Sequence, residues 1–188
     1  MLKYIRDELV SMTDKGNYQT FTSSLIPGCN NIIGVRQPAL KKYAKQPVIM
    51  KLSPNVTDIT ETARAAEAGG ADALSLINTL TGMKIDINRK TFALANKTGG
   101  VSGPIVKPIA VRMVYQVAQA VNIPIIGMGG ISCAEDAIEF ILAGASAVSV
   151  GTANFHNPAV TMEVIDGIED YMKKNGFTSV KDMVGIVR

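Results

Sequence analysis

Polar residues follow several short apolar runs of this sequence, and their types could bind a small ligand. Lys51 comes late in the apolar run 47–52. A lysine in such a run needs an anion or another functional partner, because burying an isolated charge is costly. The alternative interpretation is that Lys51 lies at a sheet edge and extends its side chain into solvent. Asn78 and Thr79 directly follow the run 73–77. They could hydrogen-bond a ligand, although a simple turn would explain the pair taken by itself.

Glycines follow two further apolar runs. Gly129 and Gly130 come after the run 125–128, and Gly151 with Thr152 comes after the run 147–150. A third glycine-rich stretch, 96–104, precedes a helical pattern and is interpreted as a loop. Backbone amides without a covering side chain can approach a phosphate closely, and a helix N-terminus favours the anion. Each stretch alone is weak evidence, but the three in successive units, together with the lysine, predict an anion-binding site.

Other reactive residue types are interpreted as structural. His156 is the single histidine and stands in a predicted loop, where a surface residue at a helix entry is expected. Cys133 begins a predicted helix, where a thiol pKa could fall, but it is interpreted as a small, half-buried helix residue. The nine methionines are interpreted as core filler. With two distant cysteines and one histidine, no metal site is predicted.

The runs that carry the candidate residues alternate with helical patterns from residue 47 onward. Strands are predicted at 47–52, 71–77, 125–128 and 145–150, and helices at 57–68, 102–121, 134–142 and from 157 towards 174. Ser132 is the expected N-cap of the third helix. This alternation with short connections predicts a parallel sheet covered by helices. The segment 81–97 interrupts it and is predicted to be an inserted hairpin or loop.

The composition predicts a globular domain and excludes several functional classes. The chain has 188 residues, of which 47% are hydrophobic, which excludes a disordered chain. A net charge of +3 without a basic stripe, and 5% aromatic residues without tryptophan, argue against nucleic-acid binding. The sequence has no apolar run of the roughly 18 residues that a membrane span needs. Cytoplasmic location is expected from the sparse cysteines.

Several strings of the sequence closely resemble one enzyme family. They are VIMKLSPNVTDI, ADALSLINTLTGM, LANKTGGVSGPIVKPIAVRMVYQV, IPIIGMGGI and EFILAGASAVSVGTANF. They resemble the C-terminal half of the class 1B dihydroorotate dehydrogenases, FMN-dependent oxidoreductases of pyrimidine (UMP) biosynthesis with a (β/α)8 TIM barrel. The resemblance covers 46–188 and implies an α/β fold made mainly of the last four β/α units. The segment 1–45 has no clear period and is expected to be atypical.

The resemblance also implies roles for individual residues and partners for the chain. The family's flavin-binding positions match Lys51, Ile77, Gly103, Gly129, Gly130, Gly151 and Thr152, and its orotate-binding positions match Asn78 and Thr79. In a (β/α)8 barrel the loops after the last two strands frequently bind phosphate, and the late glycines fall there. The class associates with a second subunit that carries FAD and an iron–sulfur cluster and passes electrons to NAD. An oligomer is therefore expected, with neither a nucleic-acid nor a membrane partner.

The catalytic base is the least defined part of this assignment. The family uses a cysteine in a motif like NxSCPN, upstream of the strand that contains KLSPN. This chain has Cys29 between Gly28 and Asn30, in the expected order but with different neighbours and a shorter spacing. Cys29 is therefore the candidate base. Two functions remain open: an oxidoreductase that converts dihydroorotate to orotate, or a catalytically inactive half-barrel that binds flavin or phosphate or pairs with another chain.

Overall fold

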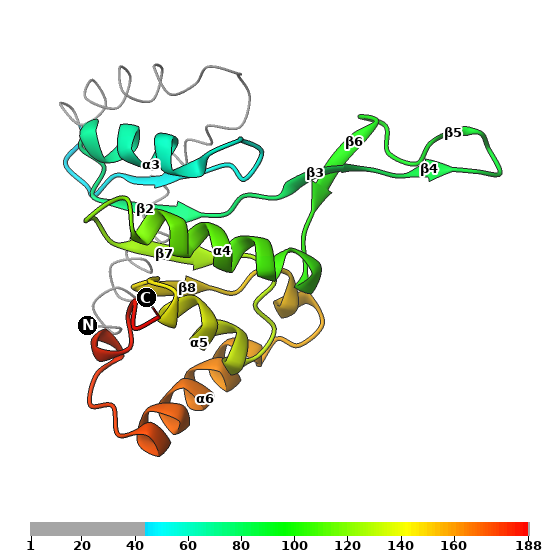
Figure 1. Cartoon of the computed structure of the whole chain (residues 1–188). Coiled ribbons are helices and arrows are strands. Elements are labelled where there is room, and N and C mark those ends of the chain that lie inside the picture. Colours follow the sequence, from blue (N-terminus) through cyan, green and yellow to red (C-terminus); the bar gives the residue numbers. More distant parts are fainter. Residues whose placement is uncertain (1–43, 188) are drawn as a thin grey trace.

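Four short strands form a parallel sheet at the centre of the protein. A computed structural model describes residues 44–187 (Figure 1), and the prediction for 1–45, including Cys29, falls almost wholly outside that range. The strands are β1 (Ile49–Lys51), β2 (Ala73–Leu76), β7 (Ile125–Met128) and β8 (Ala147–Ser149), in the spatial order β1-β2-β7-β8. All neighbouring pairs are parallel. Their carboxyl ends therefore lie along one edge of the sheet, called the carboxyl edge below.

A helix follows each strand of this sheet, as the alternating pattern predicts. These helices are α3 (Ile59–Ala68), α4 (Lys107–Ala118), α5 (Ala134–Leu142) and α6 (Val160–Asn175). Crossovers between parallel strands are right-handed, and the strand order proceeds in one direction, so the crossover helices belong on one face. Figure 1 shows α3, α4 and α5 on the same side of the strands. This arrangement is that of four successive β/α units of a barrel, whose interior lies on the other face.

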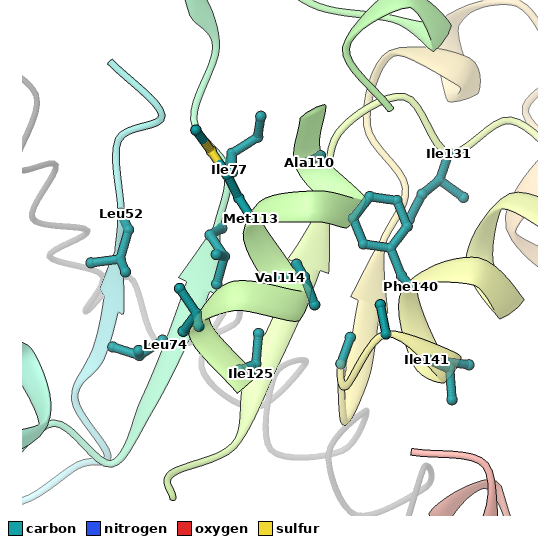
Figure 2. Packing of buried hydrophobic residues seen from close by; sticks show 14 of the residues in the cluster. Leu52, Leu74, Ile77, Ala110, Met113, Val114, Ile125, Ile131, Phe140 and Ile141 are labelled. Carbon is teal, nitrogen blue, oxygen red and sulfur yellow. The ribbon is translucent and has the colours of Figure 1, made fainter. Parts of the chain in front are cut away.

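The covered face of the sheet holds the hydrophobic core (Figure 2). Leu74 and Ile125 from the strands pack with Met113 and Val114 of α4, and Phe140 of α5 is fully buried beside them. Gly127 of β7 makes room for that ring, because a Cβ built on Gly127 would lie 2.6 Å from Phe140 Cδ1. The core is thus built from alternate strand residues and one stripe of each helix.

An arm, residues 80–101, projects from the sheet between β2 and α4. It consists of the antiparallel pairs β3 (Leu80–Met83) with β6 (Thr98–Val101) and β4 (Ile85–Asp86) with β5 (Thr91–Phe92). Figure 1 shows it extending well away from the helices. The predicted hairpin at 81–97 is confirmed and is slightly longer. The interpretation of 96–104 as one loop is wrong, because the backbone of Thr98–Val101 pairs with β3.

The structure corrects three local predictions around α4 and α5. The helix predicted from residue 102 begins at Lys107, after a 3-10 turn, η1 (Pro104–Val106). Cys133, not Ser132, is the N-cap of α5, because Ser132 donates its hydrogen bonds to the side chain of Asp136 instead. Cys133 is also exposed rather than half-buried. Two further 3-10 turns are η2 (Thr152–Phe155) and η3 (Val180–Asp182).

Within the part of the chain that the structure describes, none of the helices has the length and apolar character needed to cross a membrane. The boundary predicted between residues 45 and 46 stays a prediction.

Candidate functional site at the carboxyl edge

The carboxyl edge brings together the residues that the sequence singled out at the ends of apolar runs. Lys51 is the last residue of β1, and Asn78 lies two residues beyond the end of β2. Gly129 directly follows β7, and Gly151 lies two residues beyond β8. The register aligns Lys51 with Ser75 and Met128 with Ser149 across neighbouring strands. Residues separated by up to 100 positions in the sequence therefore share one edge of the sheet.

Lys51 lies at the carboxyl end of β1 and has its side chain on the face of the sheet opposite the helices. Its neighbours Met50 and Leu52 are buried on the helix-covered face. Because side chains alternate along a strand, Lys51 belongs to the opposite face, and it is half-buried there. None of residues 44–187 makes an ion pair or a hydrogen bond with its side chain.

The segment that carries Asn78 and Thr79 is held by its backbone and by Asn55. Backbone N–H groups of Ile77 and Asn78 donate to the carbonyls of Met128 (2.9 Å) and Leu52 (3.1 Å). The side chain of Asn55 donates to the Thr79 carbonyl at 3.0 Å and accepts from the Thr81 N–H at 2.9 Å. Sequence reasoning missed this function of Asn55. Its place three residues after a predicted strand was the available signal.

The glycines after β7 adopt backbone conformations that favour glycine. Gly129 has φ +125° and Gly130 has φ +79°, in the region that side chains rarely enter. A Cβ on Gly130 would lie 2.7 Å from the carbonyl oxygen of Gly103 and 3.0 Å from the Lys107 nitrogen. The loop after β7 therefore packs directly on the turn that begins α4. Gly103, which has φ +90°, therefore lies next to the loop after β7.

The late loops carry backbone amides that could bind an anion. Within residues 44–187, the N–H groups of Gly129, Gly130, Gly151 and Thr152 donate no hydrogen bond. Cβ atoms built on Gly103 and Gly151 would meet nothing within 4 Å, so these two glycines border open space. Unpaired donors beside open space are the features that a phosphate-binding loop needs. The residues present therefore fit a phosphate group.

A buried carboxylate stabilises these loops from behind. Asp136 Oδ1 lies 2.7 Å from Lys107 Nζ, and Asp136 Oδ2 accepts from the Ser132 N–H and hydroxyl, both at 2.8 Å. Burial by itself would raise the pKa of Asp136, but the hydrogen bonds from Lys107 and Ser132 together lower this pKa to about 2. Hydrogen bonds to Asp136 and Glu139 raise the pKa of Lys107. Sequence reasoning missed this pair, which no motif marks.

The remaining reactive residues in the described part of the chain are His156 and Cys133, and the thiol of Cys133 lies beside the Asp136 carboxylate. His156 is exposed after η2, as predicted for a surface residue. Partial burial of the sulfur and the neighbouring carboxylates raise the pKa of Cys133, so its thiol is less reactive than a free cysteine. Residues 44–187 contain no group of three or more side chains able to hold a metal ion. Cys29 lies outside the described residues.

Comparisons with known proteins identify relatives of one kind. Residues 29–172 match the family model described as dihydroorotate dehydrogenase. The dihydroorotate dehydrogenase B (NAD(+)) catalytic subunit of Lachnoclostridium phytofermentans is 70% identical over 157 residues, which are 84% of this chain and 52% of that protein. The protein of the same name from Phocaeicola vulgatus is 57% identical over 158 residues, 84% of this chain and 51% of that protein.

A solved structure has the same fold. The dihydroorotate dehydrogenase of Eimeria tenella, solved in complex with ferulenol, superposes with a TM-score of 0.67 and 28% identity, covering 84% of this chain and 47% of that one. The chain thus spans about half the length of the relatives that it matches. The expected (β/α)8 family and the four-unit arrangement are confirmed.

Proposed function

Because this chain belongs to the dihydroorotate dehydrogenase family, we propose that it supplies the flavin- and orotate-binding edge of such an enzyme in pyrimidine biosynthesis. The observation that carries the proposal is the convergence of Lys51, Asn78, Thr79 and the late glycine loops on one carboxyl edge. Ligands of parallel α/β folds bind at that edge, where loops can approach them from several strands. The proposed reaction is the oxidation of dihydroorotate to orotate.

The proposed flavin is FMN, and its binding follows from the residues on both sides of the edge. The free amides of Gly129, Gly130, Gly151 and Thr152 would bind the phosphate, with Gly103 leaving space beside them. The half-buried ammonium of Lys51 would contact the flavin ring, and the buried side chain of Ile77 would pack beside it. When bound, FMN would accept the hydride from C6 of dihydroorotate.

Asn78 and Thr79 are the proposed contacts to the substrate. Asn78 is half-buried and Thr79 is exposed, so both side chains can reach a ligand. Amide and hydroxyl groups match the carbonyl, N–H and carboxylate groups of orotate. A base must remove the C5 proton while C6 loses its hydride. Cys29 remains the proposed base.

The proposal extends to a second subunit. The curated relatives are named as catalytic subunits of an NAD(+)-dependent enzyme, which supports a partner chain in their case. For this chain we propose a partner that carries FAD and an iron–sulfur cluster and passes electrons to NAD. Reduced flavin at the carboxyl edge would be the electron donor to that partner.

Flavin binding tests the proposal directly. Titrating the 188-residue chain into FMN should quench the flavin fluorescence. Lys51→Ala should weaken FMN binding about ten-fold, the loss typical of a hydrogen bond to a charged group. Lys174→Ala removes an exposed lysine at the end of α6 and is the matched control, with unchanged binding. Absence of quenching by the unmodified chain, or equal binding by both variants, would contradict this assignment.

A further inference from the structure

Two loops of the carboxyl edge that come from different β/α units lie in direct contact. Gly130 follows β7, and the turn from Gly103 to Lys107 begins α4. A Cβ on Gly130 would come within 3.0 Å of both Lys107 N and Lys107 Cβ. A Cβ on Gly129 would likewise lie 3.2 Å from Ala110 Cβ. The position of the β7 loop therefore depends on where α4 begins.

One carboxylate joins these two segments. Asp136 lies in the first turn of α5 and is 7% exposed. One of its oxygens accepts from Lys107, the first residue of α4, at 2.7 Å. The other oxygen accepts from the backbone N–H and the hydroxyl of Ser132, at 2.8 Å each. Ser132 ends the stretch that begins with Gly129 and Gly130, so Asp136 fixes this stretch to the start of α4.

Glu139 forms an exposed ion pair with the same lysine and provides a comparison for Asp136. It accepts from the same Lys107 ammonium, at 2.6 Å, but its side chain is 49% exposed. The hydrogen bonds found for Ser132 go to Asp136, and none joins Glu139 to the β7 loop within the described residues. An exposed pair of this kind contributes little to stability. Asp136 and Glu139 therefore share a partner but differ in whether they reach the loop.

We propose that Asp136, through Lys107 and Ser132, is a positioning residue that holds the Gly129–Gly130 amides where they bind the flavin phosphate. This inference rests on the proposed function. Asp136 is not one of the proposed flavin or substrate contacts, because its side chain is buried and bonded to Lys107 and Ser132. Its carboxylate accepts three hydrogen bonds on two sides. Asparagine cannot replace it, because its NH₂ group would face either the Lys107 ammonium or the Ser132 donors.

The test compares two flavins that differ only in the phosphate. FMN and riboflavin share the ring and the ribityl chain. The FMN affinity divided by the riboflavin affinity, both measured for the 188-residue chain, therefore measures the phosphate contact. Asp136→Asn should lower this ratio about ten-fold, because the amides move out of place. Glu139→Gln should leave the ratio unchanged. A general loosening of the fold would weaken both flavins together and leave the ratio as it was.

A milder variant keeps the test decisive if Asp136→Asn does not fold. Ser132→Ala removes the hydroxyl donor from the same link at an exposed position and should lower the ratio several-fold. An unchanged ratio in folded Asp136→Asn, or in Ser132→Ala if the first variant is unfolded, would overturn the positioning function while the proposed function stands. If the unmodified chain binds neither flavin, the proposed function fails and this inference fails with it.

Discussion

Two lysines near the carboxyl edge differ in whether their ammonium groups have ion-pair partners among the described residues. Lys51 ends β1 half-buried, with no partner for its ammonium among residues 44–187. Lys107 begins α4 with two carboxylates within 2.7 Å of its ammonium. A paired lysine has its charge satisfied by the protein, whereas an unpaired, half-buried one gains most from an anionic or polar ligand. This contrast supports the proposed ligand contact of Lys51 and a structural function for Lys107.

The carboxylate that partners Lys107 should make stability depend on pH. The pKa of Asp136 is lowered from 3.8 to about 2 in the folded chain. A lowered pKa means that the carboxylate stabilises the fold above about pH 4, and that this contribution is lost as the pH falls from 4 towards 2. The expected contribution at neutral pH is about 2 kcal/mol.

Urea unfolding at pH 7 and pH 3 measures this contribution. The difference in free energy of unfolding between the unmodified chain and Asp136→Asn should be largest at pH 7 and shrink at pH 3. Glu169→Gln removes a carboxylate from an exposed pair with Lys173 and is the control, with a much smaller difference at both pH values. A difference for Asp136→Asn that does not change with pH would show that its ionisation contributes nothing.

At the scale of elements, the arm and the sheet meet at Thr79. Asn55 bonds the Thr79 carbonyl and the Thr81 N–H, on the two sides of the arm's first residue, Leu80. Gly100 of β6 packs against the Thr79 side chain so closely that any Cβ there would clash. The loop after β1 and the returning strand of the arm thus both determine where Thr79 lies.

Removing the Asn55 side chain should weaken orotate binding more than flavin binding. Asn55→Ala loses three side-chain hydrogen bonds, to Ser53, Thr79 and Thr81. Each contributes about 1 kcal/mol, and the loss of the last two frees the segment that carries Asn78 and Thr79. The expected result is a fall in orotate affinity of about ten-fold with FMN affinity kept. The measurement is the change in flavin absorbance when orotate is added to the FMN-loaded chain. Asn88→Ala, at the turn between β4 and β5, is the control, and equal orotate affinities in the two variants would contradict the prediction.

The contact between β7 and α5 sets how closely helix and sheet approach. Gly127→Ala places a Cβ 2.6 Å from Phe140 Cδ1 and 3.1 Å from Ala145 Cβ, in a core without space for it. Overpacking of this kind should reduce the free energy of unfolding by about 1–3 kcal/mol. Phe140→Leu in the same chain should restore part of that loss, because the smaller side chain vacates the space. Urea unfolding of both single variants and the double variant measures this coupling, and purely additive losses would argue against the close contact.

At the scale of the whole molecule, the described residues supply four parallel strands, whereas a closed barrel has eight. Each strand end contributes part of the site, and catalysis depends strongly on how the parts are positioned. The face of the sheet opposite the helices carries the half-buried Ile126, Met128 and Ala147. In a barrel this face is covered by side chains of the remaining strands.

The 188-residue chain supplied with FMN should therefore form orotate far more slowly than the roughly 10 per second of an ordinary enzyme. Adding the part of the Lachnoclostridium phytofermentans relative that this chain does not cover should raise the rate, because the active site of a (β/α)8 barrel takes groups from the ends of several strands. Orotate absorbance with and without that fragment is the measurement. A rate near 10 per second for the chain alone would instead point to residues 1–45 and to Cys29, and Cys29→Ser would then be the variant to measure first.

Patterns along the sequence were sufficient to predict the strands and most helices of the fold and to locate the candidate ligand-binding residues. The strands β1, β2, β7 and β8 and the helices α3 and α5 fall within a few residues of their predicted bounds. Buried parallel strands are short apolar runs, and the glycines after them mark backbone conformations that other residues avoid. These signals are local, so they can be read in order along the chain. The family resemblance, which whole motifs carry, is confirmed by the family model and by the curated relatives.

The residues that support the candidate site could be identified only from contacts between distant segments. The sequence predicts Ser132 as a helix cap, but its N–H and hydroxyl donate to Asp136 instead. The sequence also predicts one loop over 96–104, but Thr98–Val101 pairs with β3. Asn55 and Lys107 gained their functions from partners 24 and 29 residues away in the sequence. A hydrogen bond between distant segments depends on the packing of the elements that carry them, and no local pattern of residue types encodes that packing.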